Sequence, residues 1–212
     1  MFLPRGVLSV FGLAILFHAQ VFANTTATVG VYYETLSPVC RGFFINQLLP
    51  AYRQAPDRIT VRLVPFGKTV VNSTNPLTFI CDHGETECEG LKIHSCAVAL
   101  VQDQTSLLRL AGCTIRNQTD PEAILTECAT TLGIEWRPIA DCAKAARGSQ
   151  LLKLNGDKTK ELNPGVEELP TITLNGSQND ETQLRTNLWN EICKVLEAKP
   201  STCPLLESRS SG

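Results

Sequence analysis

The segment Ser37-Pro38-Val39-Cys40 holds the side chains best placed for covalent chemistry. It follows a β-branched and aromatic run over residues 28–33, typical of a strand, and precedes apolar residues at helical spacing. A helix N-terminus presents unpaired amides and a partial positive charge, which favour a thiolate. We therefore interpret Cys40 as a candidate reactive thiol. The alternative is a small buried residue or half of a structural disulfide.

A strand, a turn and a helix N-terminus are the setting of a thioredoxin-like Cys-x-x-Cys motif, but Ser37 stands where the first cysteine is expected. In the two-cysteine form, the first thiolate attacks a substrate disulfide and the second cysteine resolves the mixed disulfide. A serine hydroxyl is barely ionised near neutral pH and cannot form a disulfide. Ser37 and Cys40 are therefore predicted to be unable to run the two-cysteine cycle.

The cysteine content indicates an oxidising compartment, where thiols mostly pair. The chain has nine cysteines, so at least one stays unpaired, and such a cysteine is either intermolecular or reactive. They are Cys40, Cys81, Cys88, Cys96, Cys113, Cys128, Cys142, Cys193 and Cys203.

A second constellation begins at Cys81 and runs through His83 to Cys88, with Cys96 close behind. Cysteine and histidine at this density could bind zinc, with His83 or His94 completing the site. The spacing lacks the Cys-x-x-Cys pairs of structural zinc sites, and disulfides explain the cysteines better in the secretory pathway. We therefore expect no metal and no cofactor, and a loop role for His83.

The N-terminus is typical of a signal peptide over residues 1–23. Arg5 supplies the positive charge, residues 6–17 are apolar, and Val21-Phe22-Ala23 fits a cleavage site. An uncleaved anchor is the alternative, but an apolar run of about 12 residues is short for a bilayer. No later stretch approaches the ~18 apolar residues that a spanning helix needs, so we expect no membrane span.

Four sequons fit the same compartment, and the matching asparagines are Asn24, Asn72, Asn117 and Asn175. Asn24 would be the first mature residue and a poor acceptor. Asn72 and Asn117 lie in polar, turn-like surroundings, so we expect glycans there first.

The composition predicts one folded domain over residues 24–203, followed by a flexible tail over residues 204–212. Of 212 residues, 43% are hydrophobic, which allows a sizeable core and argues against disorder. The formal net charge is −2 with no basic block, so we expect no nucleic-acid partner.

The element pattern predicts an α/β fold. Strand patterns over residues 28–33 and 59–66 flank a helix that Pro50 kinks or ends, which makes a βαβ unit with parallel strands. Residues 67–163 are expected to form a disulfide-rich helical insertion, with helices over 98–110, 121–131 and 139–154. A strand ending at the Asn175-Gly176 turn and a last helix over 182–196 complete the domain.

The chain resembles the gamma-interferon-inducible lysosomal thiol reductase family, whose signature has the form C-Q-H-G-x2-E-C-x2-N-x4-C. Six positions match it: Cys81, His83, Gly84, Glu87, Cys88 and Cys96. Asp82 and Leu91 replace the usual glutamine and asparagine. Segments 32–40, 63–67 and 170–176 also look familial, apart from Ser37, so the resemblance spans residues 29–203.

The resemblance implies a thioredoxin-like fold and reduction of protein disulfides in an acidic endosomal or lysosomal lumen or as a secreted protein, often in host defence. It implies that Pro170 is a cis-proline facing the active-site position, a rare and site-shaping feature; an ordinary strand-start proline is the alternative. If Cys40 takes the second active-site position, the other eight cysteines can form four disulfides. We expect Cys193 to pair with Cys203 across a short loop.

Three hypotheses follow. In the first, Cys40 attacks disulfides as a lone thiolate and a small external thiol resolves the adduct. In the second, the chain is a non-catalytic relative that binds unfolded or disulfide-containing proteins near Ser37 and Pro170. In the third, the chain binds a metal or forms a covalent dimer through Cys40. Retention of a fold without its activity is common.

Overall fold

A computed structural model describes residues 26–116 and 119–204. The predicted signal peptide, the sequons at Asn24 and Asn117, and residues 205–212 of the predicted tail lie outside this part of the chain. No described helix combines the length and the apolar character needed to cross a membrane.

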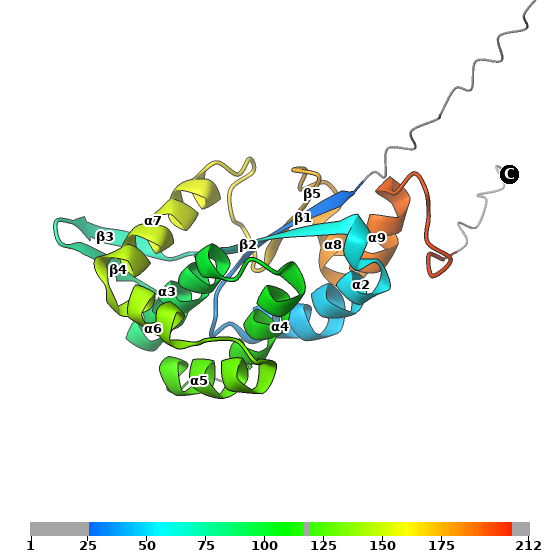
Figure 1. The fold of residues 1–212 in the computed structure, drawn as a ribbon. Coiled ribbons are helices and arrows are strands. Elements are labelled where there is room, and N and C mark those ends of the chain that lie inside the picture. The colour runs from blue at the N-terminus through cyan, green and yellow to red at the C-terminus, as the bar shows by residue number, and fades with distance from the viewer. Residues whose placement is uncertain (1–25, 117–118, 205–212) are drawn as a thin grey trace, which may run out of the picture.

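A three-stranded sheet in the order β2-β1-β5 forms the centre of the molecule (Figure 1). β1 (Ala27–Tyr33) pairs in parallel with β2 (Ile59–Pro65) and antiparallel with β5 (Thr171–Leu174). Val31 lies opposite Leu63 on one side and Ile172 on the other. The parallel pair confirms the predicted βαβ unit, and the side chains of Val29, Val31 and Tyr33 are fully buried.

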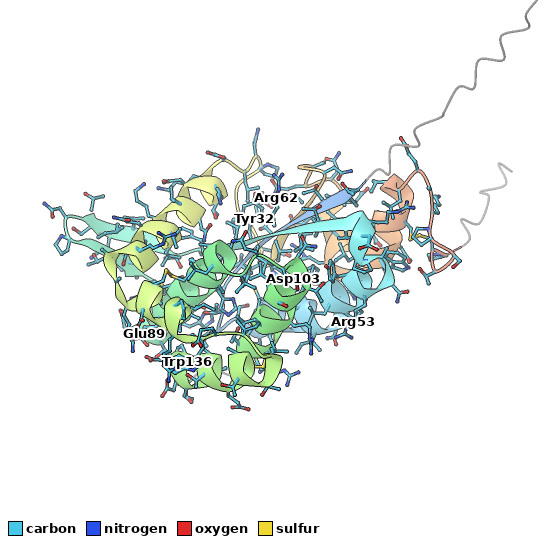
Figure 2. All side chains as sticks on the ribbon, in the orientation of Figure 1. Tyr32, Arg53, Arg62, Glu89, Asp103 and Trp136 are labelled. Atoms are coloured by element: carbon cyan, nitrogen blue, oxygen red, sulfur yellow. A yellow bond between two sulfur atoms is a disulfide. The ribbon has the colours of Figure 1, made fainter. Side chains whose placement is uncertain are left out.

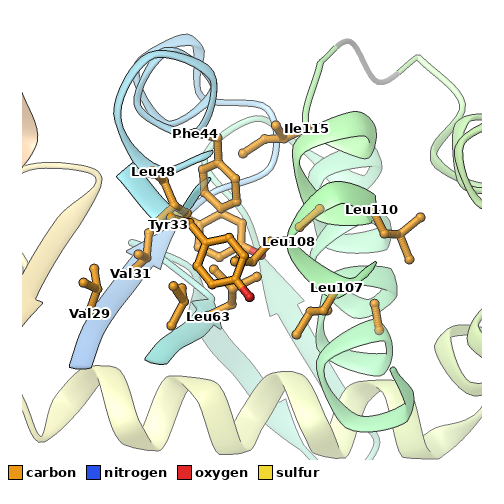
Figure 3. Close-up of a cluster of buried hydrophobic side chains, with 14 of the residues drawn as sticks. Val29, Val31, Tyr33, Phe44, Leu48, Leu63, Leu107, Leu108, Leu110 and Ile115 are labelled. Atoms are coloured by element: carbon orange, nitrogen blue, oxygen red, sulfur yellow. The ribbon is translucent and has the colours of Figure 1, made fainter. Parts of the chain in front are cut away.

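The crossover between β1 and β2 is one bent helical segment. It consists of α1 (Pro38–Phe43), the π-helical turn η1 (Phe44–Leu48), α2 (Leu49–Gln54) and the short 3₁₀ turn η2 (Pro56–Arg58). Pro50 does not end the helix, because the backbone stays helical through η1 and α2, with the π-helical turn directly before the proline. Phe44 contacts the Tyr33 ring at a centroid distance of 4.8 Å. Figure 3 shows Phe44, Leu48 and Tyr33 meeting Leu108 and Ile115 in the core between β1 and the helix that carries Leu108.

A β-hairpin that the sequence analysis did not predict follows β2. β3 (Val70–Thr74) pairs with β4 (Leu77–Ile80) and forms a separate two-stranded sheet. Its residues alternate between exposed and half-buried rather than between exposed and buried, so the hydrophobic pattern of the hairpin is weak.

Five helices follow, gathered at one end of the sheet (Figure 1). They are α3 (Glu85–Leu100), α4 (Gln104–Thr114), α5 (Pro121–Leu132), α6 (Arg137–Lys144) and α7 (Ala146–Lys160). The prediction for residues 121–131 is confirmed within one residue. The predicted helix over 98–110 is wrong, because α3 ends at Leu100 and the Asp103 side chain caps a new helix by accepting the Ser106 N–H at 2.7 Å. The predicted helix over 139–154 is likewise divided at Ala145, where the backbone is extended.

All nine cysteines lie in described residues, and eight of them form four disulfides. The pairs are Cys81–Cys88, Cys96–Cys142, Cys113–Cys128 and Cys193–Cys203. Two of the pairs join helices, α3 to α6 and α4 to α5, and so hold the helical layer together. Cys40 is the free cysteine.

The C-terminal part returns to the sheet. β5 is followed by α8 (Glu181–Thr186), which packs against β5, and by α9 (Leu188–Val195), which lies beside α2 (Figure 1). The predicted single helix over 182–196 is broken at Asn187, whose φ of −138° is not helical. Cys203 ties the segment after α9 back to Cys193, and the Trp189 indole donates to the Thr202 carbonyl at 3.0 Å.

Candidate functional site

Ser37 and Cys40 occupy the N-terminus of α1. Ser37 is the N-cap residue, and its hydroxyl accepts the Cys40 N–H at 3.4 Å. Pro38 opens the helix, where its fixed φ is favourable. The serine in the expected nucleophile position therefore caps the helix that carries the remaining thiol.

The Cys40 thiol is hidden from solvent, with 0% of the residue exposed. Burial raises the pKa of the Cys40 thiol to about 11, while hydrogen bonds with Ser37 and with the backbone of Glu34 oppose the shift. The neighbouring Val39 is 63% exposed, and Pro38 is exposed as well. The most exposed side chains in the first turn of α1, Pro38 and Val39, are apolar, with Arg41 beside them, and the thiol lies behind this turn largely in its neutral form.

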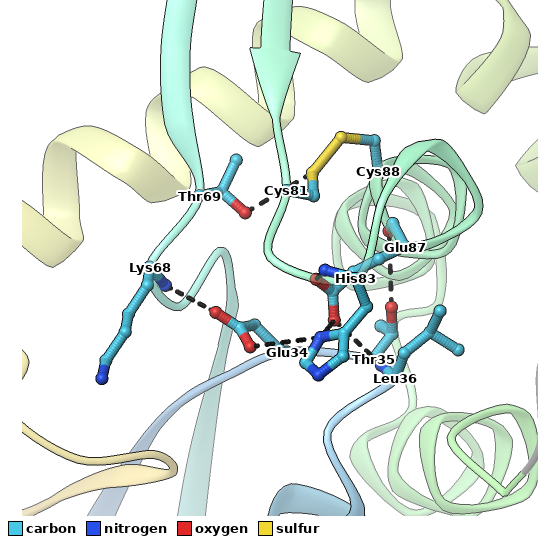
Figure 4. Close-up of a disulfide and its surroundings, with 9 residues drawn as sticks. All are labelled: Glu34, Thr35, Leu36, Lys68, Thr69, Cys81, His83, Glu87 and Cys88. Carbon is cyan, nitrogen blue, oxygen red and sulfur yellow. Dashed lines mark hydrogen bonds and ion pairs between the residues drawn. A yellow bond between two sulfur atoms is a disulfide. The ribbon is translucent and has the colours of Figure 1, made fainter.

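Two buried carboxylates and one imidazole meet beside this segment (Figure 4). The Glu34 side chain, at the end of β1, is 2% exposed, and the Glu87 side chain, in the first turn of α3, is 0% exposed. His83 Nδ1 lies 3.0 Å from Glu87 Oε1 and 3.7 Å from Glu34 Oε2. We call these three residues the Glu34–His83–Glu87 cluster.

Glu87 connects the cluster to the backbone that leads to Ser37. Its Oε1 accepts the Leu36 N–H at 3.1 Å, and its carbonyl accepts the Thr35 hydroxyl at 3.4 Å. Its Oε2 accepts the His83 N–H at 3.0 Å. The Cys81–Cys88 disulfide closes the loop that holds His83, so the position of α3 fixes the backbone immediately before Ser37.

Glu34 lies against the turn that follows β2. Gly67 has a φ of +59°, and a Cβ at that position would lie 2.4 Å from the Glu34 side chain, so only glycine fits there. Glu34 Oε1 accepts the Lys68 N–H at 2.8 Å. Burial raises the pKa of Glu34 to about 7; Glu87 and Asp82 add to the shift, and the Lys68 N–H and His83 oppose it.

The second histidine near α1 lies in a different environment. His94 is buried in α3, where its Nδ1 lies 2.8 Å from the Tyr33 hydroxyl and its Nε2 lies 2.8 Å from the Thr114 hydroxyl. Burial lowers the pKa of His94 to about 3, so the imidazole is neutral in the folded protein. Tyr33, His94 and Thr114 join β1, α3 and α4 and are called the Tyr33–His94–Thr114 relay.

The remaining predicted site residues are spread over the molecule. The Leu169–Pro170 peptide bond is cis, and Thr171 pairs with Tyr32, so Pro170 lies level with the end of β1. Asn72 is exposed on β3. Asn175 is exposed too, but its Oδ1 accepts the Thr28 N–H at 2.8 Å.

Sequence reasoning did not identify Glu34 as a site residue and treated Glu87 only as part of a signature. One signal was available, because His83 and Glu87 are spaced i, i+4, which places two side chains together at the start of a helix. Nothing in the local sequence places Glu34 beside them.

A groove of about 920 Å³ lies on the face of the sheet opposite the buried side chains of Val29, Val31 and Tyr33. Its floor includes Thr28, Gly30 and Thr173, and its walls include Tyr32 and Arg62, which project from that face in Figure 2. Cys40 and the Glu34–His83–Glu87 cluster do not line it.

Comparisons with known proteins agree with this architecture. The family model described as "Gamma interferon inducible lysosomal thiol reductase (GILT)" matches residues 28–132. A gamma-interferon-inducible lysosomal thiol reductase-like protein from Anopheles gambiae is 32% identical, with 90% of this chain and 86% of the relative covered. A gamma-interferon-inducible lysosomal thiol reductase from Carassius auratus is 30% identical, with 89% and 76% covered.

Solved structures give the same fold at low identity. A thiol-disulfide oxidoreductase from Actinomyces oris has a TM-score of 0.56 and 15% identity, with 84% of this chain and 83% of that chain covered. BdbD from Bacillus subtilis has a TM-score of 0.54 and 13% identity, with 78% and 87% covered. These similarities support the thioredoxin-like fold of the chain.

Proposed function

Because the chain belongs to the gamma-interferon-inducible lysosomal thiol reductase family, we propose that it is a member without the two-cysteine cycle. It binds unfolded or disulfide-containing proteins near Ser37 and Pro170, where Pro38 and Val39 are exposed. It acts in the lumen of the secretory and endolysosomal pathway, after removal of the signal peptide, in host defence. Asn72 and Asn175 are the sequons exposed in the described residues, and they are the sites where glycans are proposed.

One observation carries this proposal: the remaining thiol, Cys40, is fully buried behind a serine that cannot attack a disulfide. A nucleophilic thiol must reach the substrate sulfur and must be ionised to attack it. Burial works against both requirements for Cys40. The exposed Val39 keeps an apolar contact surface that needs no thiol.

A one-thiol reductase is the second candidate, supported by the position of Cys40 in the first turn of α1. In that reaction, the Cys40 thiolate would attack a substrate disulfide, forming a mixed disulfide and releasing one substrate thiol. A small external thiolate would then attack the substrate sulfur of the mixed disulfide, which regenerates Cys40 and leaves a disulfide between the external thiol and the substrate. A second external thiolate would release the second substrate thiol and form the disulfide of the external thiol. The cycle requires α1 to expose Cys40.

Thiol titration and a reductase assay separate the two candidates. We expect Cys40 to react with a thiol reagent only after unfolding. We expect disulfide reduction of insulin with external thiol, at about pH 5 and pH 7, to equal the background and to be unchanged by Cys40→Ser. Ser37→Cys should raise the rate at least about tenfold, because it supplies the missing first thiolate. Activity of the natural chain that is lost in Cys40→Ser would establish the one-thiol reductase instead.

Binding is tested on the same surface with a reduced and alkylated unfolded protein, which cannot undergo thiol exchange. Val39→Asp should weaken binding about tenfold, because it places a charge in the proposed apolar contact. Ile45→Asp is the matched control, since Ile45 is also exposed but lies one helical segment away. Equal effects of the two variants, or no binding by the natural chain, would refute the proposed surface.

A further inference from the structure

The Glu34–His83–Glu87 cluster contains two carboxyl groups and one basic side chain. Both carboxylates are buried, and His83 is the basic side chain that pairs with them in the described part of the chain. Lys68 contributes its backbone N–H to Glu34, while its side chain points away from the cluster (Figure 4). Buried carboxylates are normally paired with cations or bound to metals.

Glu34 has unused capacity to bind a cation. Its Oε1 accepts the Lys68 N–H, but its Oε2 has no hydrogen-bond donor among the described residues and lies 3.7 Å from His83 Nδ1. This carboxylate is almost fully buried and directs Oε2 toward the imidazole. One oxygen of a buried side chain is therefore free to act as a ligand at the centre of the cluster.

The distances suit a metal ion. We propose that Glu34, His83 and Glu87 form a binding site for a divalent cation, with Zn²⁺ as the ion that fits best. The ligand atoms of all three residues lie within 4.8 Å of one another. Two ligands of a tetrahedral zinc ion with bonds of about 2.0–2.2 Å are about 3.4 Å apart, and the separations of 3.0 and 3.7 Å lie on either side of that value.

The types of ligand atom, and the hydrogen bonds that orient the carboxylates, also favour Zn²⁺. Imidazole nitrogen and carboxylate oxygen are both ligand types of Zn²⁺, and three protein ligands would leave a fourth position to water or another group, as in open zinc sites. The backbone N–H groups of Leu36, His83 and Lys68 would orient the two carboxylates from the outer shell. His83 is 42% exposed on its side chain, which gives an ion a path from solvent. This site is separate from the zinc arrangement that cysteines could form, because those cysteines are in disulfides.

Zinc binding is measured on the full secreted chain carrying Cys40→Ser, which removes the free thiol as a competing ligand. After removal of metal by a chelator, titration calorimetry near pH 7.4 should show one Zn²⁺ per chain. His83→Gln should weaken binding at least about tenfold, since it removes one of three ligands. Asp82→Asn is the matched control, because it removes a neighbouring exposed carboxylate outside the cluster, and it should bind zinc nearly as well as the parent.

A second readout guards against misfolding of a variant. Zinc should raise the Tm of the parent chain and not that of Glu34→Gln, because a ligand stabilises only the state that binds it. Absence of zinc binding in the parent would mean that the cluster holds only a proton, and this result would overturn the proposal. Binding that persists in His83→Gln with unchanged affinity would overturn it as well.

Discussion

The two described histidines near α1 differ in almost every respect except residue type. His83 is partly exposed, lies in the loop before α3 and faces two carboxylates. His94 is buried within α3, faces two hydroxyl groups and has no acidic partner among its described contacts. Burial without a negative partner keeps His94 neutral, whereas His83 faces two carboxylates and solvent.

This difference indicates separate tasks. The Tyr33–His94–Thr114 relay joins three elements of the core and is expected to contribute mainly to stability. The Glu34–His83–Glu87 cluster holds the backbone before Ser37 and opens to solvent, so it is expected to contribute mainly to binding. Variants of the two histidines should therefore separate stability from function.

The largest effect is expected for His94→Gln. Glutamine cannot reproduce both ring hydrogen bonds, so it leaves a buried hydroxyl unsatisfied and a gap in the core, for a loss of about 2–4 kcal/mol in the free energy of unfolding. Urea denaturation at neutral pH measures the loss. His83→Gln is the matched control and should lose less, because the His83 side chain is 42% exposed and a glutamine amide can still donate to Glu87. Equal losses in the two variants would contradict the separation of tasks.

Acid should weaken the folded protein through His94. Its pKa is about 3 in the folded state and about 6.5 when unfolded, so below pH 6.5 the unfolded chain takes up a proton that the folded chain does not. The stability present above pH 6.5 is then lost by up to about 1.4 kcal/mol per pH unit as the pH falls toward 3. Urea denaturation of the natural chain and of His94→Gln between about pH 7 and pH 4.5 tests this. The variant, although less stable, should lose less stability over that interval, and parallel curves would exclude His94 as the cause.

The four disulfides offset such a cost at acidic pH, because cross-links restrict the unfolded chain. Cys96–Cys142 joins α3, the helix that carries His94, to α6, and Cys113–Cys128 joins α4 to α5. A neutral buried histidine is therefore tolerable in a protein whose helical layer is cross-linked on both sides of it.

The sheet could be predicted from sequence because β1 and β2 show their burial in the residue pattern. The extent of α3 could not, since Glu87, His94 and Ser95 are buried together with its apolar side chains, which removes the helical contrast between faces. The β3-β4 hairpin was missed because neither of its faces is fully buried. These errors arise from tertiary contacts that override local pattern.

Some residues of the candidate site could be predicted from sequence, and others could not. Ser37 and Cys40 were recognisable, because a strand, a turn and a helix start within a few residues determine their placement. The burial of Cys40 and the approach of Glu34 to His83 depend on the turn at Gly67 and on α3, which are distant in sequence. Local spacing indicated the His83–Glu87 pair and could not indicate the third member.

A smaller loss of stability is expected when the Tyr33 hydroxyl is removed and the His94 ring is kept. Tyr33→Phe keeps the ring contact with Phe44 but removes the hydroxyl that faces His94 Nδ1 at 2.8 Å. An unsatisfied buried nitrogen should lower the free energy of unfolding by about 1–2 kcal/mol, less than His94→Gln, because Thr114 still faces Nε2. Combining Tyr33→Phe with His94→Gln in a double-mutant cycle should give a loss smaller than the sum of the single losses, as the two residues share one hydrogen bond. Additive losses would show that Tyr33 and His94 contribute independently to the free energy of unfolding. The hydrogen bond between them would then add no measurable stability.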